Sequence, residues 1–379
     1  MNRPADSTQA RLDRIRGPVP PRSHNARTIA ALAANPGCAR RAILDAAGAD
    51  KQRIAAHLGF PPRYGQSQFA ITRGNAFEAQ VKADGCAELL TLLRAHLSLP
   101  IPEASYNNLD EVGGDVSQHL RHTRTQHLLG RAARSGEDAG TLFDHPLLRL
   151  EVGGRPVYLE PDLIAFQLHG RFHVVEIKSF AVIDGQADGD KVAAAVIQSA
   201  VYVLALRDLL AGQGIGPEAV ADEVLLVCPE NFSSKPAAAS LDVRRQLTVL
   251  RRQLSRLERI DSLLRSVPAE LSFDLLPDQA GTARRDPADL AAAMRVVPAR
   301  YAPDCLSTCE MCFFCRDEAA ALTARLGRTV LEDLGGIEHL GMVLRLASGQ
   351  ARPGDDQAEA ALLLAGAARM RGELLGEAV

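Results

Sequence analysis

Two acids and one lysine near the middle of the sequence have the types and the spacing for chemistry. Glu176 and Lys178 lie two residues apart in the β-branched run Phe172–Phe180, which is typical of a strand buried on both faces. Side chains at positions i and i+2 of a strand point the same way, so these two charges emerge side by side. Asp162 precedes them on what the pattern predicts to be the neighbouring strand. Burying three charges together is costly unless they hold an ion or do chemistry.

The order of these residues resembles the PD-(D/E)xK nuclease core. Pro161-Asp162, then Glu176-Ile177-Lys178, then Gln198-x-x-x-Tyr202 look like its RecB-like branch, which carries a trailing QxxxY helix. The resemblance implies an α/β fold with a restriction-endonuclease-like core, in which helices flank a central mixed sheet. It also implies that Asp162, Glu176 and the carbonyl of Ile177 hold Mg²⁺ or Mn²⁺, and that Lys178, Gln198 and Tyr202 complete the catalytic set. The alternative is a buried Glu–Lys ion pair in an ordinary hairpin, with Gln198 and Tyr202 at the surface.

Hydrolysis of a phosphodiester is the reaction that such residues serve. A divalent ion neutralises the developing charge and makes a bound water a better nucleophile, and hard ions prefer carboxylate and carbonyl oxygens. The chain has 5 Lys among its 43 Lys and Arg residues, so a lysine at position 178 is notable. The pKa of a lysine moves with its surroundings, whereas an arginine stays protonated. Lys178 therefore suits orienting or activating the attacking water, or steadying the phosphate.

A helix predicted over Thr72 to Leu97 extends the resemblance. Its start, Arg73-Gly74-Asn75-Ala76-Phe77-Glu78, matches the family's G-x-x-x-E or G-x-x-x-H opening. The resemblance implies that Glu78 is a further metal ligand, although many RecB-like exonucleases have His at this place. The alternative is an exposed glutamate in the first turn that stabilises the helix dipole.

Four of the seven cysteines fall close together as C305-x3-C309-x2-C312-x2-C315, which predicts a thiolate-bound metal. Structural zinc usually uses two Cys pairs separated by a longer loop, which this run lacks, whereas an iron–sulfur cluster accepts irregular spacing. From the residues alone, either the four local cysteines suffice or Cys38 joins three of them.

The resemblance favours one of these ligand sets. Nucleases that carry a cluster beside a RecB-like core place one cysteine before the core and three after it, ending in C-x5-C. This implies a 4Fe-4S cluster on Cys38, Cys305, Cys309 and Cys315, with Cys312 spare, although Cys305 is one residue further away than usual. Zinc or a redox sensor remains an alternative.

The patterning predicts the following organisation. The expected segments are a disordered arm over 1–25; a RecB-like nuclease domain over 26–335, with its core over 72–230, a helical insertion over 231–300 and cluster-binding segments over 26–47 and 301–320; and a helical tail over 336–379. Two strands around the turn Gly153-Gly154 are expected to form a meander that feeds the catalytic hairpin. The stretch Leu241–Val267 is expected to be an amphipathic helix with an arginine face.

Composition limits the classes of function. A net charge of −3 means that contact with DNA needs local basic patches, not overall charge. We find no apolar run of about 18 residues and no signal segment, which predicts a cytoplasmic protein without a membrane span. The absence of a G-x-x-x-x-G-K-[ST] motif means that a helicase, if used, is a separate partner. The sequence thus predicts a metal-dependent DNA nuclease, acting as an exonuclease on single strands or ends in repair, recombination or anti-phage defence. The alternatives are a non-catalytic DNA-binding or assembly subunit and an iron–sulfur redox-sensing DNA-binding protein.

Overall fold

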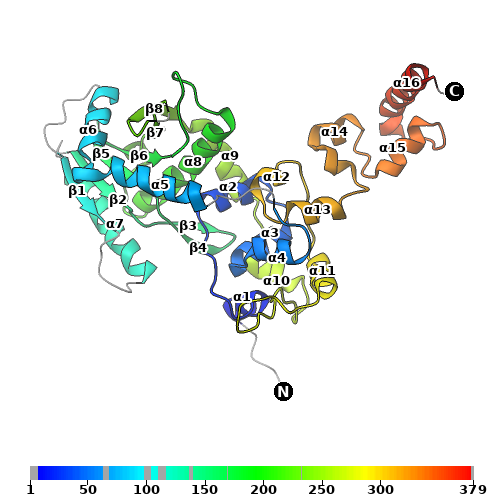
Figure 1. The fold of residues 1–379 in the computed structure, drawn as a ribbon, viewed down its shortest axis with the longest axis horizontal. Coiled ribbons are helices and arrows are strands. Elements are labelled where there is room, and N and C mark those ends of the chain that lie inside the picture. Colours follow the sequence, from blue (N-terminus) through cyan, green and yellow to red (C-terminus); the bar gives the residue numbers. More distant parts are fainter. Residues whose placement is uncertain are drawn as a thin grey trace. The chain divides into compact units, whose positions relative to one another are not determined.

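The computed structural model describes residues 7–62, 68–97, 104–109, 117–135, 140–168, 170–231 and 233–376. They divide into two compact units, which the chain enters alternately (Figure 1). The sheet unit comprises Arg22–Pro36 and Gly65–Ser266, and the cysteine unit comprises Met1–Pro21, Gly37–Tyr64 and Val267–Val379. This division differs from the predicted single domain over 26–335, because residues 26–36 belong to one unit and residues 37–47 to the other.

The sheet unit is built on a six-stranded mixed sheet flanked by helices, which confirms the coarse α/β prediction. In spatial order its strands are β1 (Ala104–Asn108), β2 (Gly140–Asp144), β5 (Leu163–Leu168), β6 (Arg171–Ile177), β7 (Glu223–Pro229) and β8 (Pro236–Asp242). The pairs β1–β2 and β6–β7 are parallel and the other neighbours are antiparallel. Its helices are α2 (Ala26–Ala34), α5 (Gln68–Val81), α6 (Ala83–Leu97), α7 (Gln118–Ser135), α8 (Gly189–Ala211), η1 (Pro217–Ala219), α9 (Arg244–Leu254) and α10 (Ile260–Arg265).

Alternation along the central strands divides their side chains between two helical layers. On one face, Val175 and Ile177 of β6 pack with Phe77 and Val81 of α5 and with side chains of α6. On the other face, Leu226 and Cys228 of β7 pack with Ala195 of α8. Because neighbouring residues of a strand face opposite ways, Glu176 lies on the α8 side of β6.

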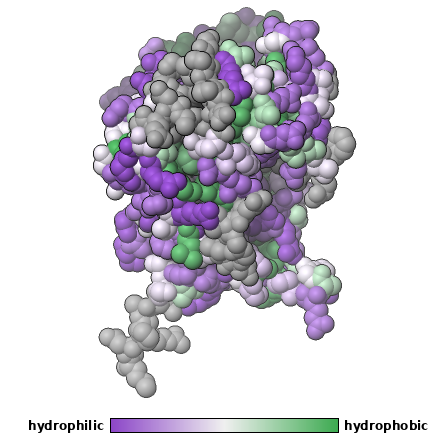
Figure 2. Space-filling model, turned by 90° about the vertical axis from the view of Figure 1, so that its left-hand side faces the viewer, coloured by the Kyte–Doolittle hydropathy of each residue, from purple (hydrophilic) through white to green (hydrophobic). Residues whose placement is uncertain are grey.

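The helix α8 is the one described helix that is long and apolar enough to cross a membrane by length and composition. This differs from our expectation that no such segment exists. However, 61% of its apolar window is buried inside the unit, as in the core helix of a soluble protein. Figure 2 shows one face of the molecule, on which hydrophilic residues predominate and hydrophobic residues form small separate areas. These features are compatible with a soluble protein.

Three predicted elements differ in the structure. The helix expected over Thr72–Leu97 is divided between α5 and α6 after Val81, and α6 itself contains a non-helical stretch in which Asp84, Gly85 and Cys86 have positive φ angles of 51–65°. The helix expected over Leu241–Val267 begins with residues that belong to strand β8 in the structure. This strand also lies within the segment 231–300, which was predicted to be a helical insertion. Its alanine-rich sequence lacks β-branched residues, and pairing with β7 outweighs that low propensity.

The turn at Gly153-Gly154 forms as predicted, but its strands do not join the main sheet. The strands β3 (Leu148–Val152) and β4 (Arg155–Leu159) pair with each other in a separate two-stranded sheet. The loop after β4 then leads directly to Asp162 and β5.

The regular elements of the cysteine unit are all helices in the part of the chain that the structure describes, and irregular segments such as 267–286 connect them. Its elements are α1 (Thr8–Arg16), α3 (Ala39–Ala47), α4 (Lys51–His57), α11 (Pro287–Val296), α12 (Cys305–Thr308), α13 (Cys312–Glu318), η2 (Thr323–Leu326), α14 (Arg328–Asp333), α15 (Leu340–Ala347), η3 (Asp355–Gln357) and α16 (Ala358–Leu375). The helices α15 and α16 lie within the segment 336–379, where a helical tail was predicted.

The helix α1 corrects the prediction of a disordered arm over 1–25 for the residues that the structure describes, which begin at Ser7; residues 1–6 lie outside them. Ser7 caps it by accepting a hydrogen bond from the Ala10 N–H, and Leu12 and Ile15 are buried. The Phe273 N–H also donates to the Ile15 carbonyl at 2.7 Å. Only two apolar residues mark this helix in an arginine-rich sequence, so its burial depends on a partner segment far along the chain.

We expect Leu12→Ala to lower the free energy of unfolding by about 2–5 kcal/mol, because Leu12 is 0% exposed and its loss leaves a cavity. Leu362→Ala is the matched control, since Leu362 in the same unit is 75% exposed and its truncation leaves no cavity. Chemical denaturation followed by circular dichroism measures both. Equal free energies of unfolding in the two variants would mean that residues 8–16 do not pack against the rest of the unit.

Candidate active site

The hairpin β5–β6 brings the two predicted acids together at the end of the sheet. Asp162 directly precedes β5, and the register that pairs Leu163 with Val175 places it beside the end of β6. The Ile177 N–H donates a hydrogen bond to Asp162 Oδ2 at 2.8 Å, so the main chain at the predicted carbonyl ligand lies against this carboxylate. Glu176 is 0% exposed. The acids that the sequence spacing singled out therefore share one small region.

Burial dominates the electrostatics of this pair. It raises the pKa of Glu176 to about 8, with a further increase from the Asp162 charge and an opposing effect of Lys178. Burial also raises the pKa of Asp162, and the Lys178 ammonium again acts in the opposite direction. Both acids are harder to ionise here than in water, so their charged forms need additional positive charge nearby.

Lys178 supplies part of that charge. Its ammonium forms an ion pair with Glu176 Oε1, while Glu176 Oε2 has no hydrogen-bond partner among the described residues. Burial acts to lower the pKa of Lys178, but the Glu176 and Asp162 carboxylates outweigh it, so the pKa lies above its ordinary value. Lys178 is thus held as a cation in this arrangement.

The predicted QxxxY pair lies on α8, facing the same region. Gln198 Nε2 donates to the Tyr202 hydroxyl at 3.3 Å, and Tyr202 is only 4% exposed. Burial raises the pKa of Tyr202 well above its ordinary value, and the nearby charges of Glu176 and Asp162 raise it further. Tyr202 is therefore a buried neighbour of the acids and not a surface residue, and Gln198 binds it rather than Lys178.

Glu78 on α5 lies within electrostatic reach of Asp162 and Glu176, since its charge raises the pKa of both. It does not stand alone, because the Lys82 ammonium pairs with Glu78 Oε1 at 2.5 Å and with Asp144 Oδ1 at 2.6 Å. Asp144, at the end of β2, is 3% exposed. Glu78 lies in the third turn of α5. The alternative interpretation, a first-turn glutamate that stabilises the helix dipole, therefore does not account for it.

His145 and Glu160 extend this network. The His145 Nε2 lies 3.1 Å from Lys82 Nζ and 3.6 Å from Glu78 Oε1, and its Nδ1 lies 3.1 Å from Glu160 Oε1. The Arg121 guanidinium reaches Glu160 Oε2 at 3.4 Å. The φ of His145 is +49°, a left-handed backbone that few non-glycine residues adopt and that clusters at functional sites.

The sequence indicated no role for five members of this network, which are Lys82, Arg121, Asp144, His145 and Glu160. One signal was present for Lys82, because Glu78 and Lys82 stand at i, i+4 on a helix, the spacing of an ion pair. Asp144-His145 follows an apolar run, but nothing in the sequence places the end of β2 beside α5.

The charges of this region fit a divalent cation. Five carboxylates, those of Glu78, Asp144, Glu160, Asp162 and Glu176, are arranged around three permanent cations, those of Lys82, Arg121 and Lys178. The hydrogen bond with Glu160 raises the pKa of His145, so this imidazole can add a further positive charge to the region. The described residues contain no group of three or more His, Cys, Asp or Glu side chains arranged to hold a metal ion. Magnesium commonly takes one or two protein carboxylates and keeps several waters, so Asp162 and Glu176 meet its requirements.

The predicted cluster ligands lie in the cysteine unit. All seven cysteines are among the described residues, where they are buried and form no disulfide. Cys38 precedes α3, and Cys305 and Cys315 lie in α12 and α13. Cys315 is within electrostatic reach of both Cys38 and Cys309, whereas Cys305 and Cys312 share Tyr301 as a neighbour. Among the described residues, however, no three cysteines are arranged to hold a metal ion, so the predicted ligand set stays a prediction.

Buried basic residues surround these thiols. Arg40 is 3% exposed and its Nη1 donates to Cys315 Sγ at 3.3 Å. The charges of Arg41 and Lys51 lower the pKa of Cys309, which burial, the larger effect, raises to about 11. Lys51 is also buried, and its ammonium pairs with Asp45.

The nearby cations favour the thiolate, which is the form that binds a metal or a cluster, but they do not outweigh burial, which raises the pKa of Cys315 to about 12. The sulfur donors match the ligand type of an iron–sulfur centre. The all-sulfur donor set does not suit Mg²⁺ or Mn²⁺, which take oxygen ligands.

Comparisons with protein-family models and with curated proteins find no match. A comparison with solved structures finds one described as "Crystal structure of SSO0001", which is similar at 13% sequence identity over 59% of this chain and 95% of that chain, with a TM-score of 0.19. A TM-score of this size carries no argument about the fold or the activity of this chain.

We expect Lys82→Met to lower the free energy of unfolding by about 3–5 kcal/mol, because it leaves the Asp144 carboxylate buried without its ammonium partner. Lys235→Met is the control, since Lys235 pairs with Glu230 at 3.0 Å but its side chain is 72% exposed, so the expected cost is about 0–1 kcal/mol. Urea denaturation compares the two. Similar losses in both variants would mean that the Lys82 network contributes no more than a surface ion pair.

Proposed function

We propose that this protein is a metal-dependent deoxyribonuclease of the RecB-like kind, built on a restriction-endonuclease-like core. The observation that carries the proposal is the meeting of Asp162, Glu176 and Lys178 at the end of one buried hairpin, with both carboxylate pKa values raised. An ordinary hairpin ion pair would leave no second acid beside it and no unpartnered, fully buried carboxylate oxygen.

The order of elements supports the same proposal. A helix bearing Glu78 precedes the sheet, an antiparallel hairpin carries Asp162 and Glu176, and the helix α8 with its Gln198-x-x-x-Tyr202 pair leads back to a strand parallel to β6. This is the succession of strand, turn, strand, loop and helix on which the sequence resemblance rests.

In the proposed mechanism, Asp162 and Glu176 bind the cation, and the main chain at Ile177 lies beside them. A bound Mg²⁺ or Mn²⁺ would neutralise charge that develops on the phosphate and activate a water. The raised pKa of Lys178 favours a lysine that stays protonated, so its ammonium orients the water or steadies the phosphate instead of removing a proton. Tyr202, held by Gln198, closes the α8 side of this region against water.

We propose DNA as the substrate and a separate protein as the source of any strand-separating activity. We propose exonuclease action on single strands or ends, because repair, recombination and anti-phage defence all use such enzymes. The proposed location is the cytoplasm. The cysteine unit is proposed to carry a 4Fe-4S cluster on Cys38, Cys305, Cys309 and Cys315, in a structural and not a redox role.

We expect the protein to cut end-labelled DNA in Mg²⁺ or Mn²⁺, and Asp162→Asn and Lys178→Ala to slow cutting by at least about 100-fold. Lys191→Ala is the matched control, since Lys191 lies on α8 with 59% of its side chain exposed and touches none of these acids. Gel electrophoresis of labelled single and double strands gives the rate and the direction of cutting. Two variants that cut like the parent protein would leave a DNA-binding or assembly subunit as the better description.

We expect the protein isolated without oxygen to be brown, with broad visible absorption. Cys38→Ser is expected to lose colour, iron and sulfide, because it removes one cluster ligand, whereas Cys312→Ser leaves them unchanged. Cys86→Ser is the control, since Cys86 is 0% exposed but lies in the core of the sheet unit. Absorption spectra with iron and sulfide analysis test this, and zinc in place of iron and sulfide would contradict it.

A further inference from the structure

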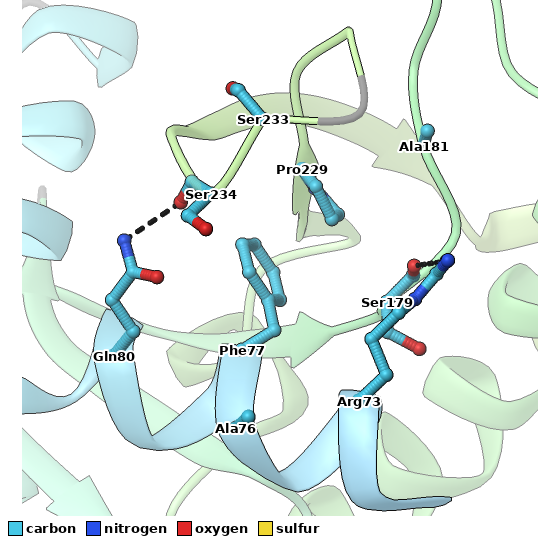
Figure 3. A pocket seen from close by; sticks show the side chains of 9 residues that line it. All are labelled: Arg73, Ala76, Phe77, Gln80, Ser179, Ala181, Pro229, Ser233 and Ser234. Atoms are coloured by element: carbon cyan, nitrogen blue, oxygen red, sulfur yellow. Dashed lines mark hydrogen bonds between the residues drawn. The ribbon is translucent and has the colours of Figure 1, made fainter. Parts of the chain in front are cut away.

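A cavity of about 230 Å³ lies in the sheet unit between α5, the segment after β6 and the turn from β7 to β8 (Figure 3). Arg73, Ala76, Phe77 and Gln80 line it from α5 at positions i, i+3, i+4 and i+7, so one complete face of the helix turns toward it. The segments opposite contribute Ser179 and Pro229, among others.

Two hydrogen bonds fix the walls of the cavity. Gln80 Nε2 donates to the Ser234 carbonyl at 2.8 Å, and Arg73 Nη2 donates to the Ser179 carbonyl. Figure 3 shows these bonds at opposite ends of the cavity, with the Phe77 ring rising between them toward Pro229. The helix α5 is thereby held to both opposite segments, and the space between them is preformed.

The lining fits a flat, partly polar ring. The Phe77 ring and Pro229 provide apolar surface, and the hydroxyls of Ser179 and Ser234 provide hydrogen-bonding groups around it, whereas the Ser233 hydroxyl donates to the Glu230 carbonyl within its own turn. The volume is below the roughly 300–1,000 Å³ of pockets that enclose a drug-sized molecule, so the occupant is one part of a larger ligand. Nucleobases meet these conditions, because every base has a π-face for an aromatic ring and polar edges for hydroxyls.

The cavity adjoins the proposed active site along two chain segments. Ser179 directly follows Lys178, and Phe77 directly precedes Glu78, so the same two segments carry both sites. A side-chain carbon at Gly74 would lie 3.7 Å from the Ser179 hydroxyl, which places α5 in van der Waals contact with the segment after β6. The exposed Arg27 side chain is near enough to Lys178 to affect its pKa, and Arg73 is exposed at the cavity, so cations for the DNA backbone flank both sites.

We propose that this cavity binds one unstacked base of a single DNA strand whose phosphate lies at Lys178. This proposal rests on the proposed nuclease function and narrows its substrate to strands with a free base next to the cut. A base inside a duplex is stacked and paired, so it cannot enter without leaving the helix.

The test uses the full chain and a fluorescein-labelled strand of twelve thymidines, bound in Ca²⁺ and checked by gel to be uncut. Ala76→Leu narrows the cavity from α5, and Ser234→Leu narrows it from the opposite turn. Ala79→Leu is the matched control, since Ala79 is exposed on the same helix and does not line the cavity. Thermal melting of each variant verifies that it is folded.

We expect both cavity variants to bind the strand about tenfold more weakly than the parent protein and Ala79→Leu to bind like it. A single abasic residue, moved along the strand, is expected to weaken binding to the parent by a similar factor at one position and to have no further effect on Ala76→Leu. Parent-like binding by folded Ala76→Leu and Ser234→Leu, or the lack of any sensitive abasic position, would overturn the base site. A parent protein that binds in this way but cuts no DNA in Mg²⁺ or Mn²⁺ would overturn the nuclease proposal alone.

Discussion

The full burial of the Glu176 carboxylate beside Asp162 is the constraint on which the rest of the sheet unit depends. A charged carboxylate without water costs several kcal/mol unless other charges compensate for it. The hairpin register fixes where the two acids meet, and the Ile177 N–H and the Lys178 ammonium compensate for part of their charge. The remaining deficit is a property of the fold, because neither acid can turn to solvent without disturbing β6.

The outer network gives the other acids partners on the chain itself. Lys82 pairs with both Glu78 and Asp144, while Arg121 and His145 bind Glu160. One ammonium cannot balance two carboxylates, so unbalanced negative charge lies on α5 and β2 as well as on the inner pair. In the proposed metal site, Lys82 would therefore influence cation binding without touching the cation.

The sequence predicted the inner residues of the site but not Lys82, Asp144 and His145 of the outer network, for one physical reason. The spacing of Glu176 and Lys178 within a strand and of Gln198 and Tyr202 on a helix is local, and local periodicity fixes which side chains share a face. Lys82, Asp144 and His145 meet only because α5 packs against the end of β2. The same holds for α1, whose Leu12 is buried against a distant segment, and for β8, whose alanines become a strand only through β7.

The division of the chain links the two proposed sites through topology. The cysteine unit takes segments from both ends of the chain, so most residues between Cys38 and Cys305 belong to the sheet unit. A cluster that joins these cysteines would close a loop that contains the sheet unit. The entropic cost of closing a loop grows only with the logarithm of its length, so a large inserted unit adds little to the cost of assembling the cluster. In return, the cross-link would restrict the unfolded chain over its whole length, and the sheet unit would be stabilised without donating any ligand.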